Sequence, residues 1–258
     1  MAEAILITSG KGGAGKSTVA SNLAVCFAQM GKKTVLIDLD IGLRSLDIML
    51  GVENRVVYDL ADIADGICRV KQALIKRDEK SELYLIAAPQ TRDGASLTGE
   101  ALQKAVDALK ARFDIVLLDS PAGIGRIFHN ALYASDRCII VAQPDAVSVR
   151  DAERVSRLIE KAGAYLAGVI VNRVKRDTPE TYLKALPDAV RAPLLGILPE
   201  DEKASQLSSR GITAVEVGSA SAKAFRDAAR RLLGEDVPFR DVRRSGIRGF
   251  FRRAFRKE

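Results

Sequence analysis

The chain has 258 residues, of which 47% are hydrophobic and 28% charged, a composition typical of one large or two small globular domains. Its formal net charge is +7, but residues 240–258 hold eight basic and two acidic side chains, which leaves only +1 for the other 239 residues. The positive charge therefore belongs to a tail and does not indicate a generally basic protein that coats nucleic acid.

The three cysteines, Cys26, Cys68 and Cys138, are far apart and form no CxxC pair. They predict neither a disulfide framework nor a zinc or iron–sulfur site within one chain, and they favour a reducing cytoplasm. The N-terminus has neither the basic segment nor the apolar core of a signal peptide. No stretch of the chain reaches about 18 uninterrupted apolar residues. We expect a cytoplasmic chain that does not cross a membrane.

Short apolar segments alternate with helical patterns along the chain. The expected strands are 5–8, 34–38, 83–87, 115–119, 138–142, 169–174 and 194–198, and the expected helices are 17–30, 98–112, 147–162, 179–190 and 219–233. This alternation predicts an α/β fold, with a mainly parallel, twisted sheet of seven or eight strands and helices on both faces. We expect one domain over 1–236 and a linker with a tail over 237–258, because Pro238 breaks the chain before the basic segment.

A glycine-rich segment matches the GxxxxGK[ST] motif between the first expected strand and the first expected helix. Its glycines would let successive backbone N–H groups converge on phosphate oxygens, while Lys16 supplies a cation and Ser17 a ligand for Mg²⁺. The motif predicts a P-loop NTPase fold that binds ATP with Mg²⁺. The predicted nucleotide-binding residues of this segment are Gly10, Lys11, Gly12, Gly13, Ala14, Gly15, Lys16, Ser17 and Thr18.

Three aspartates lie at the carboxyl ends of expected strands. Asp38 and Asp40 end or follow the second strand, and Asp119 ends the fourth. Carboxylates at this edge of an open α/β sheet face the ligand crevice, so we predict that Ser17, Asp119 and Asp40 hold Mg²⁺ directly or through water. Asp38 could instead cap the turn that follows it.

Lys11 is a second lysine within the loop and would elsewhere be interpreted as a solvated surface residue. Here the segment over 11–18, KGGAGKST, resembles the deviant Walker A motif of the ParA/MinD family of ATPases. Further similarity to the septum-positioning branch of this family covers the chain from Ile5 to about Glu235, and the tail, and is carried by residues 40–47, 54–59, 72–76, 89–93, 119–124 and 148–152. One departure stands out, because residues 125–127, Gly-Arg-Ile, replace the Glu-Thr-Gly run of the family. We therefore expect stimulation of hydrolysis or the dimer contact to differ.

The resemblance implies roles for several residues. Lys11 would reach the phosphates of the nucleotide held by the opposite subunit, so that ATP lies in the interface of a homodimer. Asp40 would orient the attacking water with Asp38 as a supporting residue, which makes Lys11, Lys16, Asp40 and Asp38 the predicted catalytic set. Asn172 would read the adenine edge, although without the resemblance it would be interpreted as a turn former. The turn with Pro199 and Asp201 would close over the base.

The basic tail carries an apolar stripe at helical spacing, formed by Ile247, Phe250, Phe251 and Phe255 with arginines beside it. Such a helix could bind an anionic membrane surface, a groove of a partner or nucleic acid. We favour the membrane, because stacking on bases needs separated aromatic side chains whereas this stripe is continuous. One tail would bind weakly, and two tails on an ATP-bound dimer would bind far better.

Together these features predict an ATP-dependent dimerising ATPase that binds peripherally to the inner face of the bacterial membrane and helps to position the division septum. The resemblance implies a MinC-like partner and MinE-, MinJ- or DivIVA-like regulators. A related ATPase that controls flagellar number or placement and a ParA-type DNA-partition ATPase are the alternatives, the latter with salt-sensitive DNA binding. An iron–sulfur carrier would need paired cysteines, and a small-molecule kinase would need an acceptor lid that the sequence does not indicate.

Overall fold

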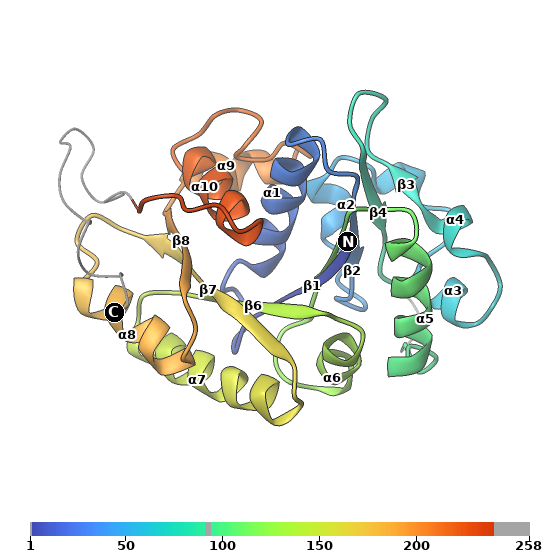
Figure 1. Ribbon diagram of the computed structural model, residues 1–258. Helices are drawn as coiled ribbons and strands as arrows, with labels where there is room; N and C mark the ends of the chain where they lie inside the picture. The colour runs from blue at the N-terminus through green and yellow to red at the C-terminus, as the bar shows by residue number, and fades with distance from the viewer. Residues whose placement is uncertain (1, 91–93, 240–258) are drawn as a thin grey trace.

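A computed structural model describes residues 2–90 and 94–239 of the chain. Its centre is an eight-stranded sheet with the order β3-β4-β2-β5-β1-β6-β7-β8 (Figure 1). Neighbouring strands are parallel except for β3 and β4, which pair antiparallel. The strands are β1 Glu3–Thr8, β2 Thr34–Asp38, β3 Ile75–Lys76, β4 Leu83–Ile86, β5 Ile115–Asp119, β6 Arg137–Ala142, β7 Tyr165–Val174 and β8 Leu194–Pro199. The predicted α/β fold with a mainly parallel sheet is confirmed.

The seven expected strands and five expected helices are all present, with ends that shift by a few residues. The helices are α1 Lys16–Gln29, α2 Leu46–Met49, α3 Leu60–Ala64, α4 Val70–Ala73, α5 Gly99–Lys110, α6 Arg126–Tyr133, α7 Ala146–Lys161, α8 Glu180–Val190, α9 Glu202–Ser208 and α10 Ala222–Leu232, with a 3₁₀ turn at Glu53–Arg55. The elements absent from the prediction, β3 and α2, α3, α4, α6 and α9, have at most eight residues, too few for a clear period in the sequence.

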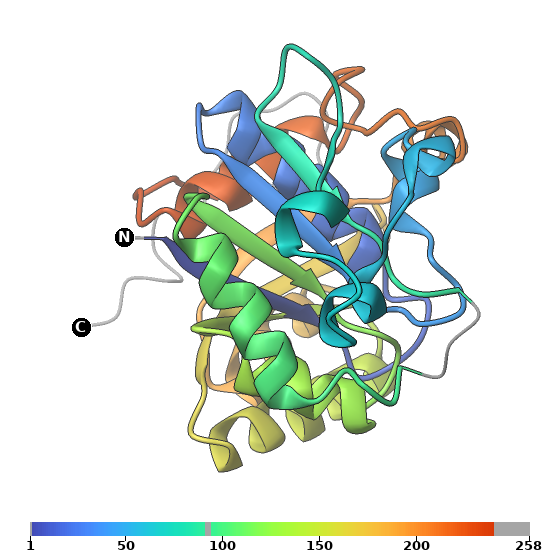
Figure 2. The same ribbon diagram turned by 90° about the vertical axis from the view of Figure 1, so that its right-hand side faces the viewer.

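Helices cover both faces of the sheet, as Figure 1 and the perpendicular view in Figure 2 show. Alternate strand residues point to opposite faces, so Ile5 and Ile7 of β1 pack with α1 and α10, whereas Ala4 and Leu6 pack with α5 to α8. All four of these strand side chains are completely buried. Two apolar cores, one on each face, therefore fix β1 at the centre of the molecule.

The strand order changes direction at β1, which lies between β5 on one side and β6 on the other. In an open α/β sheet, a crevice forms at such a point outside the carboxyl ends of the strands, and ligands bind there. The glycine-rich segment follows the carboxyl end of β1, at Thr8. The fold therefore places this segment where the crevice forms.

None of the described helices is long and apolar enough to span a membrane. The predicted membrane-binding stripe of Ile247, Phe250, Phe251 and Phe255 lies outside the described residues, which end at Phe239.

Candidate active site

The backbone of the segment between β1 and α1 forms a loop that opens onto the N-terminus of α1. Gly13 and Gly15 have φ angles of 74° and 94°, in the left-handed region that glycine adopts without strain. Gly15 is the N-cap of α1, and no side chain caps this end of the helix. The first N–H groups of α1 therefore remain available, and the positive end of the helix dipole favours an anion at this point.

Two glycines of the loop are required by space, and Gly15 is also required by conformation. A Cβ atom on Gly10 would lie 2.4 Å from the Cβ atom of Asp151 in α7, and one on Gly15 would lie 2.2 Å from the amide nitrogen of Asn172. The loop is also held from outside, because the Gln143 side chain donates to the carbonyl oxygen of Gly13 over 3.0 Å. The loop is thus a shaped backbone cradle of the kind that binds phosphate groups.

Lys16 is the cation inside this cradle. Its side chain is buried, and burial lowers the pKa of its ammonium group, while the charges of Asp119 and Asp40 act in the opposite direction. Within the described residues, the ammonium group donates no hydrogen bond. A buried ammonium group without a bonded partner fits the binding of a phosphate oxygen.

Asp119 is completely buried at the end of β5, opposite Asp38 of β2 and Ile7 of β1. Neither of its carboxylate oxygens accepts a well-formed hydrogen bond from the described residues. Burial raises the pKa of Asp119 to about 8, and the charge of Asp38 adds to this effect, whereas the Ser17 hydroxyl and the Lys16 charge lower it. Unpaired buried carboxylate oxygens beside Ser17 could bind a Mg²⁺ ion directly or through a water molecule.

No group of three or more acidic, His or Cys side chains that could hold a metal ion by itself occurs in the described part of the chain. The binding of Mg²⁺ by Ser17, Asp119 and Asp40 stays a prediction.

Asp38 and Asp40 differ in their surroundings. The completely buried Asp38 accepts hydrogen bonds from the backbone N–H groups of Asp40 at 2.9 Å and Leu46 at 3.2 Å. Burial raises the pKa of Asp38 to about 6. Asp40 is only partly buried, and its pKa is raised by burial against the lowering effect of Lys16. Asp38 therefore holds the start of the segment that carries Asp40, and Asp40 is close enough to Lys16 for their charges to interact. The roles of both aspartates in hydrolysis stay predictions.

The raised pKa of Asp119 predicts a pH dependence for metal binding. Below about pH 8 the carboxyl group keeps its proton in the nucleotide-free protein, so Mg²⁺ must displace that proton. We expect the gain in ADP affinity on adding Mg²⁺ to grow with pH up to about 8, by at most about tenfold per pH unit.

Titration calorimetry at several pH values would measure this gain. The variant Asp119→Asn keeps only the pH dependence that comes from the nucleotide's own protons, so it should show a smaller gain that varies less with pH than that of the unmodified chain. An equal pH dependence in this variant and the unmodified chain would contradict the assignment of Asp119.

Lys11 lies at the rim of the loop and not within the cradle. Its ammonium group forms an ion pair with Asp145 at 3.1 Å, and 30% of its side chain is exposed. Asp145 in turn is the N-cap of α7 and accepts hydrogen bonds from the backbone N–H and the hydroxyl of Ser148. The sequence analysis did not identify Asp145 or Gln143, although both follow the carboxyl end of β6, the position that marks ligand-facing residues in this type of sheet.

The residues predicted to contact the base have partners within the chain. The amide group of Asn172 donates to the carbonyl oxygen of Ala14 over 2.9 Å, so it lies against the loop. The Asp201 carboxylate caps α9 through Ala204 and accepts three hydrogen bonds from Ser219 and Ser221. The backbone around Pro199, rather than the Asp201 side chain, is therefore the part of this turn that could pack on a base. The contact of these residues with adenine stays a prediction.

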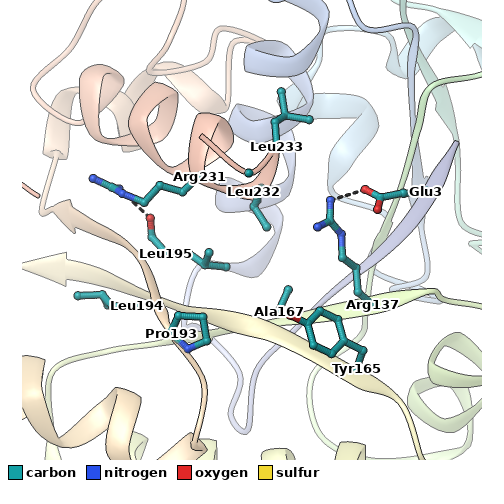
Figure 3. A pocket seen from close by; sticks show the side chains of 11 residues that line it. Glu3, Arg137, Tyr165, Ala167, Pro193, Leu194, Leu195, Arg231, Leu232 and Leu233 are labelled. Carbon is teal, nitrogen blue, oxygen red and sulfur yellow. Dashed lines mark hydrogen bonds and ion pairs between the residues drawn. The ribbon is translucent and has the colours of Figure 1, made fainter. Parts of the chain in front are cut away.

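A cavity of about 620 Å³ lies at the other edge of the sheet (Figure 3). It is lined by the N-terminal ends of β1, β6, β7 and β8 and by the end of α10. Arg137 pairs there with Glu3, and Arg231 donates to the carbonyl oxygen of Leu195 over 2.8 Å. Because the strands are parallel, this cavity is separated from the glycine-rich loop by the length of the sheet and does not belong to the nucleotide site.

A glycine-rich loop with a buried lysine, set between the central strand and the next helix of a doubly wound sheet, defines a P-loop nucleotide-binding protein. The family model described as the CobQ/CobB/MinD/ParA nucleotide binding domain matches residues 5–214. The chain belongs to this family, and within it to the MinD ATPases. The resemblance inferred from the sequence is confirmed.

The relatives cover almost the whole chain. The septum site-determining protein MinD of Helicobacter pylori is 40% identical over 97% of this chain and 97% of its own length. A chain of the MinC:MinD cell division protein complex from Aquifex aeolicus is 38% identical, with a TM-score of 0.84 over 93% of this chain and 99% of that chain. The septum site-determining MinD of Pyrococcus horikoshii, solved with Mg-ADP, is 31% identical with a TM-score of 0.81 over 90% of this chain and 96% of that one.

Proposed function

We propose that the protein is an ATP-driven dimerising switch that helps to position the division septum from the inner face of the cell membrane. The observation that carries this proposal is the arrangement of the two loop lysines. Lys16 is buried in the phosphate cradle beside Asp119, whereas Lys11 is held at the rim by Asp145. The relatives that share this chain's full length are named for septum-site determination, and one of them was solved with Mg-ADP.

Each group of the cradle has a task in ATP hydrolysis. The backbone N–H groups of the loop and of α1 bind the phosphates, and Lys16 balances their charge. Ser17 and Asp119 would hold Mg²⁺, which supplies further positive charge to the phosphate oxygens. The Asp40 carboxylate accepts a hydrogen bond from the attacking water and orients it. Hydrolysis then resets the switch, because the contacts to the terminal phosphate are lost.

Dimerisation would use Lys11. Its ammonium group needs only to leave Asp145 to reach an anion presented by a second subunit, since 30% of the side chain is already exposed. A phosphate group carries more negative charge than one carboxylate, so the terminal phosphate of ATP, where it reaches the second subunit, would favour this transfer. The ion pair with Asp145 would thus hold Lys11 in the monomer and release it in the ATP-bound dimer.

Membrane binding would use the tail over 240–258. The described chain ends at the edge of the sheet opposite the phosphate loop, where Arg231 donates to the carbonyl oxygens of Val237 and Pro238 and stacks on the Phe239 ring at 3.7 Å. The last described residue, Phe239, thus lies away from the nucleotide site, which leaves that site free to join two subunits. A dimer would bind a membrane through both tails, and the second contact is intramolecular.

A liposome sedimentation assay with ATP, ADP and no nucleotide tests this function. We expect the unmodified chain to sediment with anionic vesicles only in ATP, and Phe250→Glu to remain in the supernatant while it still dimerises in ATP. The substitution places a charge within the apolar stripe, which removes the apolar burial on which such a helix depends. Gly249→Glu is the matched control, because it adds the same charge on the opposite side of the helical projection and should lose less binding.

The controls separate the alternatives. If Phe250→Glu sedimented like the unmodified chain, the tail would not be the membrane anchor. Binding to DNA that weakens steeply with salt, in place of vesicle binding, would select a DNA-partition ATPase. A MinC-like partner is the first to test for the ATP dimer, since one similar structure is a MinC:MinD complex, and MinE-, MinJ- or DivIVA-like proteins are the proposed regulators.

A further inference from the structure

Arg126 stands at an unusual position for a cation. It is the first residue of α6, directly after the loop that follows Asp119, and Gly125 at the N-cap offers no side-chain cap. The N-terminal turn of a helix carries a partial positive charge, which disfavours a basic side chain there unless its charge is used elsewhere. Its charge must therefore be used elsewhere in the fold.

The Arg126 guanidinium group is used to hold the segment over 94–97, which leads into α5. It donates to the carbonyl oxygen of Gly94 over 3.0 Å and to that of Ala95 over 3.3 Å. One turn further along α6, the Asn130 amide donates to the carbonyl oxygen of Leu97. Three backbone carbonyl groups of this segment are thus fixed to one face of α6.

The segment over 94–97 also contacts Ile41, the residue after Asp40. Gly94 has a φ of 63°, and a Cβ atom at this position would lie 2.2 Å from the Cδ1 atom of Ile41. The Ile41 side chain therefore packs directly on the Gly94 backbone. The next residue is held too, because the N–H of Gly42 donates to the carbonyl oxygen of Pro89 over 3.0 Å.

We propose that Arg126 is a positioning residue for ATP hydrolysis, which acts on Asp40 through Gly94 and Ile41. By fixing the Gly94 carbonyl group to α6, it gives the Ile41 side chain a rigid support and so limits the movement of the adjacent Asp40 carboxylate. Through Gly94, the contact links Ile41, in the segment that carries Asp40, to α6, which follows Asp119 in the chain. This inference rests on the proposed role of Asp40 in orienting water.

The chemistry of the contact favours arginine. A guanidinium group presents several N–H donors in one plane and can serve two successive carbonyl groups, whereas an ammonium group acts as a point donor. Ala95 is exposed, and the carbonyl oxygen of the buried Gly94 also accepts from the backbone N–H of Leu97 over 3.0 Å, so loss of Arg126 leaves no buried carbonyl group unpaired. Loss of the contact should therefore change the order of the segment more than the stability of the fold.

Steady-state ATPase kinetics of Arg126→Ala test the proposal. We expect kcat to fall by about tenfold, because small displacements of a water-orienting group are costly, while KM for ATP and the unfolding temperature stay close to those of the unmodified chain. Arg126→Lys should recover part of kcat, since it can still donate to one carbonyl group. Arg112→Ala is the matched control, because it removes an exposed arginine that precedes β5 at the other edge of the sheet.

A fluorescence measurement reports on the segment itself. The chain contains no tryptophan, so Leu43→Trp, at a position that is 76% exposed and two residues from Ile41, introduces a unique probe. Adding Arg126→Ala should lower the fluorescence anisotropy of this probe, and adding Arg112→Ala should not. A purely structural role of Arg126, without an effect on the segment that carries Asp40, would leave the anisotropy unchanged.

The outcomes distinguish this inference from the proposed function. If Asp40→Ala is inactive but Arg126→Ala hydrolyses ATP at the unmodified rate or faster, the positioning role is wrong and the function stands. If KM rises together with the fall in kcat, Arg126 contributes to nucleotide binding instead, and the inference is also wrong. If Asp40→Ala hydrolyses ATP normally, the proposed role of Asp40 fails independently of Arg126.

Discussion

Replacement of Lys16 by alanine is expected to reduce nucleotide affinity by at least about 100-fold, the loss that corresponds to one charge-assisted hydrogen bond of roughly 3 kcal/mol. The cradle would keep its backbone donors, but it would lose the buried cation that lies between Asp119 and Asp40. The phosphates would then face two carboxylates without a balancing charge. Titration with a fluorescent ATP analogue measures the affinity, and Lys32→Ala, at an exposed position after the other end of α1, serves as the control.

Lys11→Ala should behave differently, because Lys11 lies outside the cradle in its own subunit. We expect this variant to bind the ATP analogue within about threefold of the unmodified affinity, a change of less than 1 kcal/mol, but to form no ATP-dependent dimer. Light scattering in ATP would detect the dimer. A normal dimer of Lys11→Ala would contradict the role across the subunit interface, and a loss of affinity equal to that of Lys16→Ala would place Lys11 in its own nucleotide site.

Much of the fold could be predicted because its strands and long helices have clear periods. The strands of the sheet centre are continuous apolar runs, as expected where both faces are covered, and α5 repeats its apolar residues at helical spacing. The two-residue strand β3 and the four-residue helices α2 and α4 carry no period of their own. These short elements form because the surrounding chain packs against them, and a local sequence pattern does not predict such packing.

The parts of the site that could be predicted are those whose residues form a contiguous sequence motif or end an expected strand. Residues 10–18 form a loop at the N-terminus of α1, and Asp38 and Asp119 end neighbouring strands, as the sequence predicted. The partners that hold these residues were missed, because Asp145 and Gln143 are distant from the loop in the sequence, after strand β6, and meet the loop only in the folded chain. The same limit applies to Asp201, whose pairing with Ser219 and Ser221 in the next turn could not be seen from its spacing. The role of Arg126 is likewise visible only once Gly94 and Ile41 are in contact.

Asp40→Ala is expected to lower kcat for ATP hydrolysis by at least about 100-fold while ATP binding stays intact, because orienting the attacking water matters for the chemical step and not for holding phosphates. Affinity could even rise slightly, since the substitution removes a negative charge that faces Lys16 and the phosphates. The ATP-bound dimer should accumulate and stay on anionic vesicles after the unmodified chain has hydrolysed its ATP and dissociated. Phosphate release and vesicle sedimentation over the same time course measure both effects.

Glu79→Ala is the control for this variant, because it removes an exposed carboxylate between β3 and β4, far along the chain from the site, and should hydrolyse and dissociate normally. Rapid turnover by Asp40→Ala would move the water-orienting role to another group. Asp38 could not take that role without rearrangement, because both of its oxygens already accept backbone hydrogen bonds from Asp40 and Leu46. A slow variant that nevertheless left the vesicles would separate membrane release from hydrolysis, and it would show that loss of the terminal phosphate is not what resets the switch.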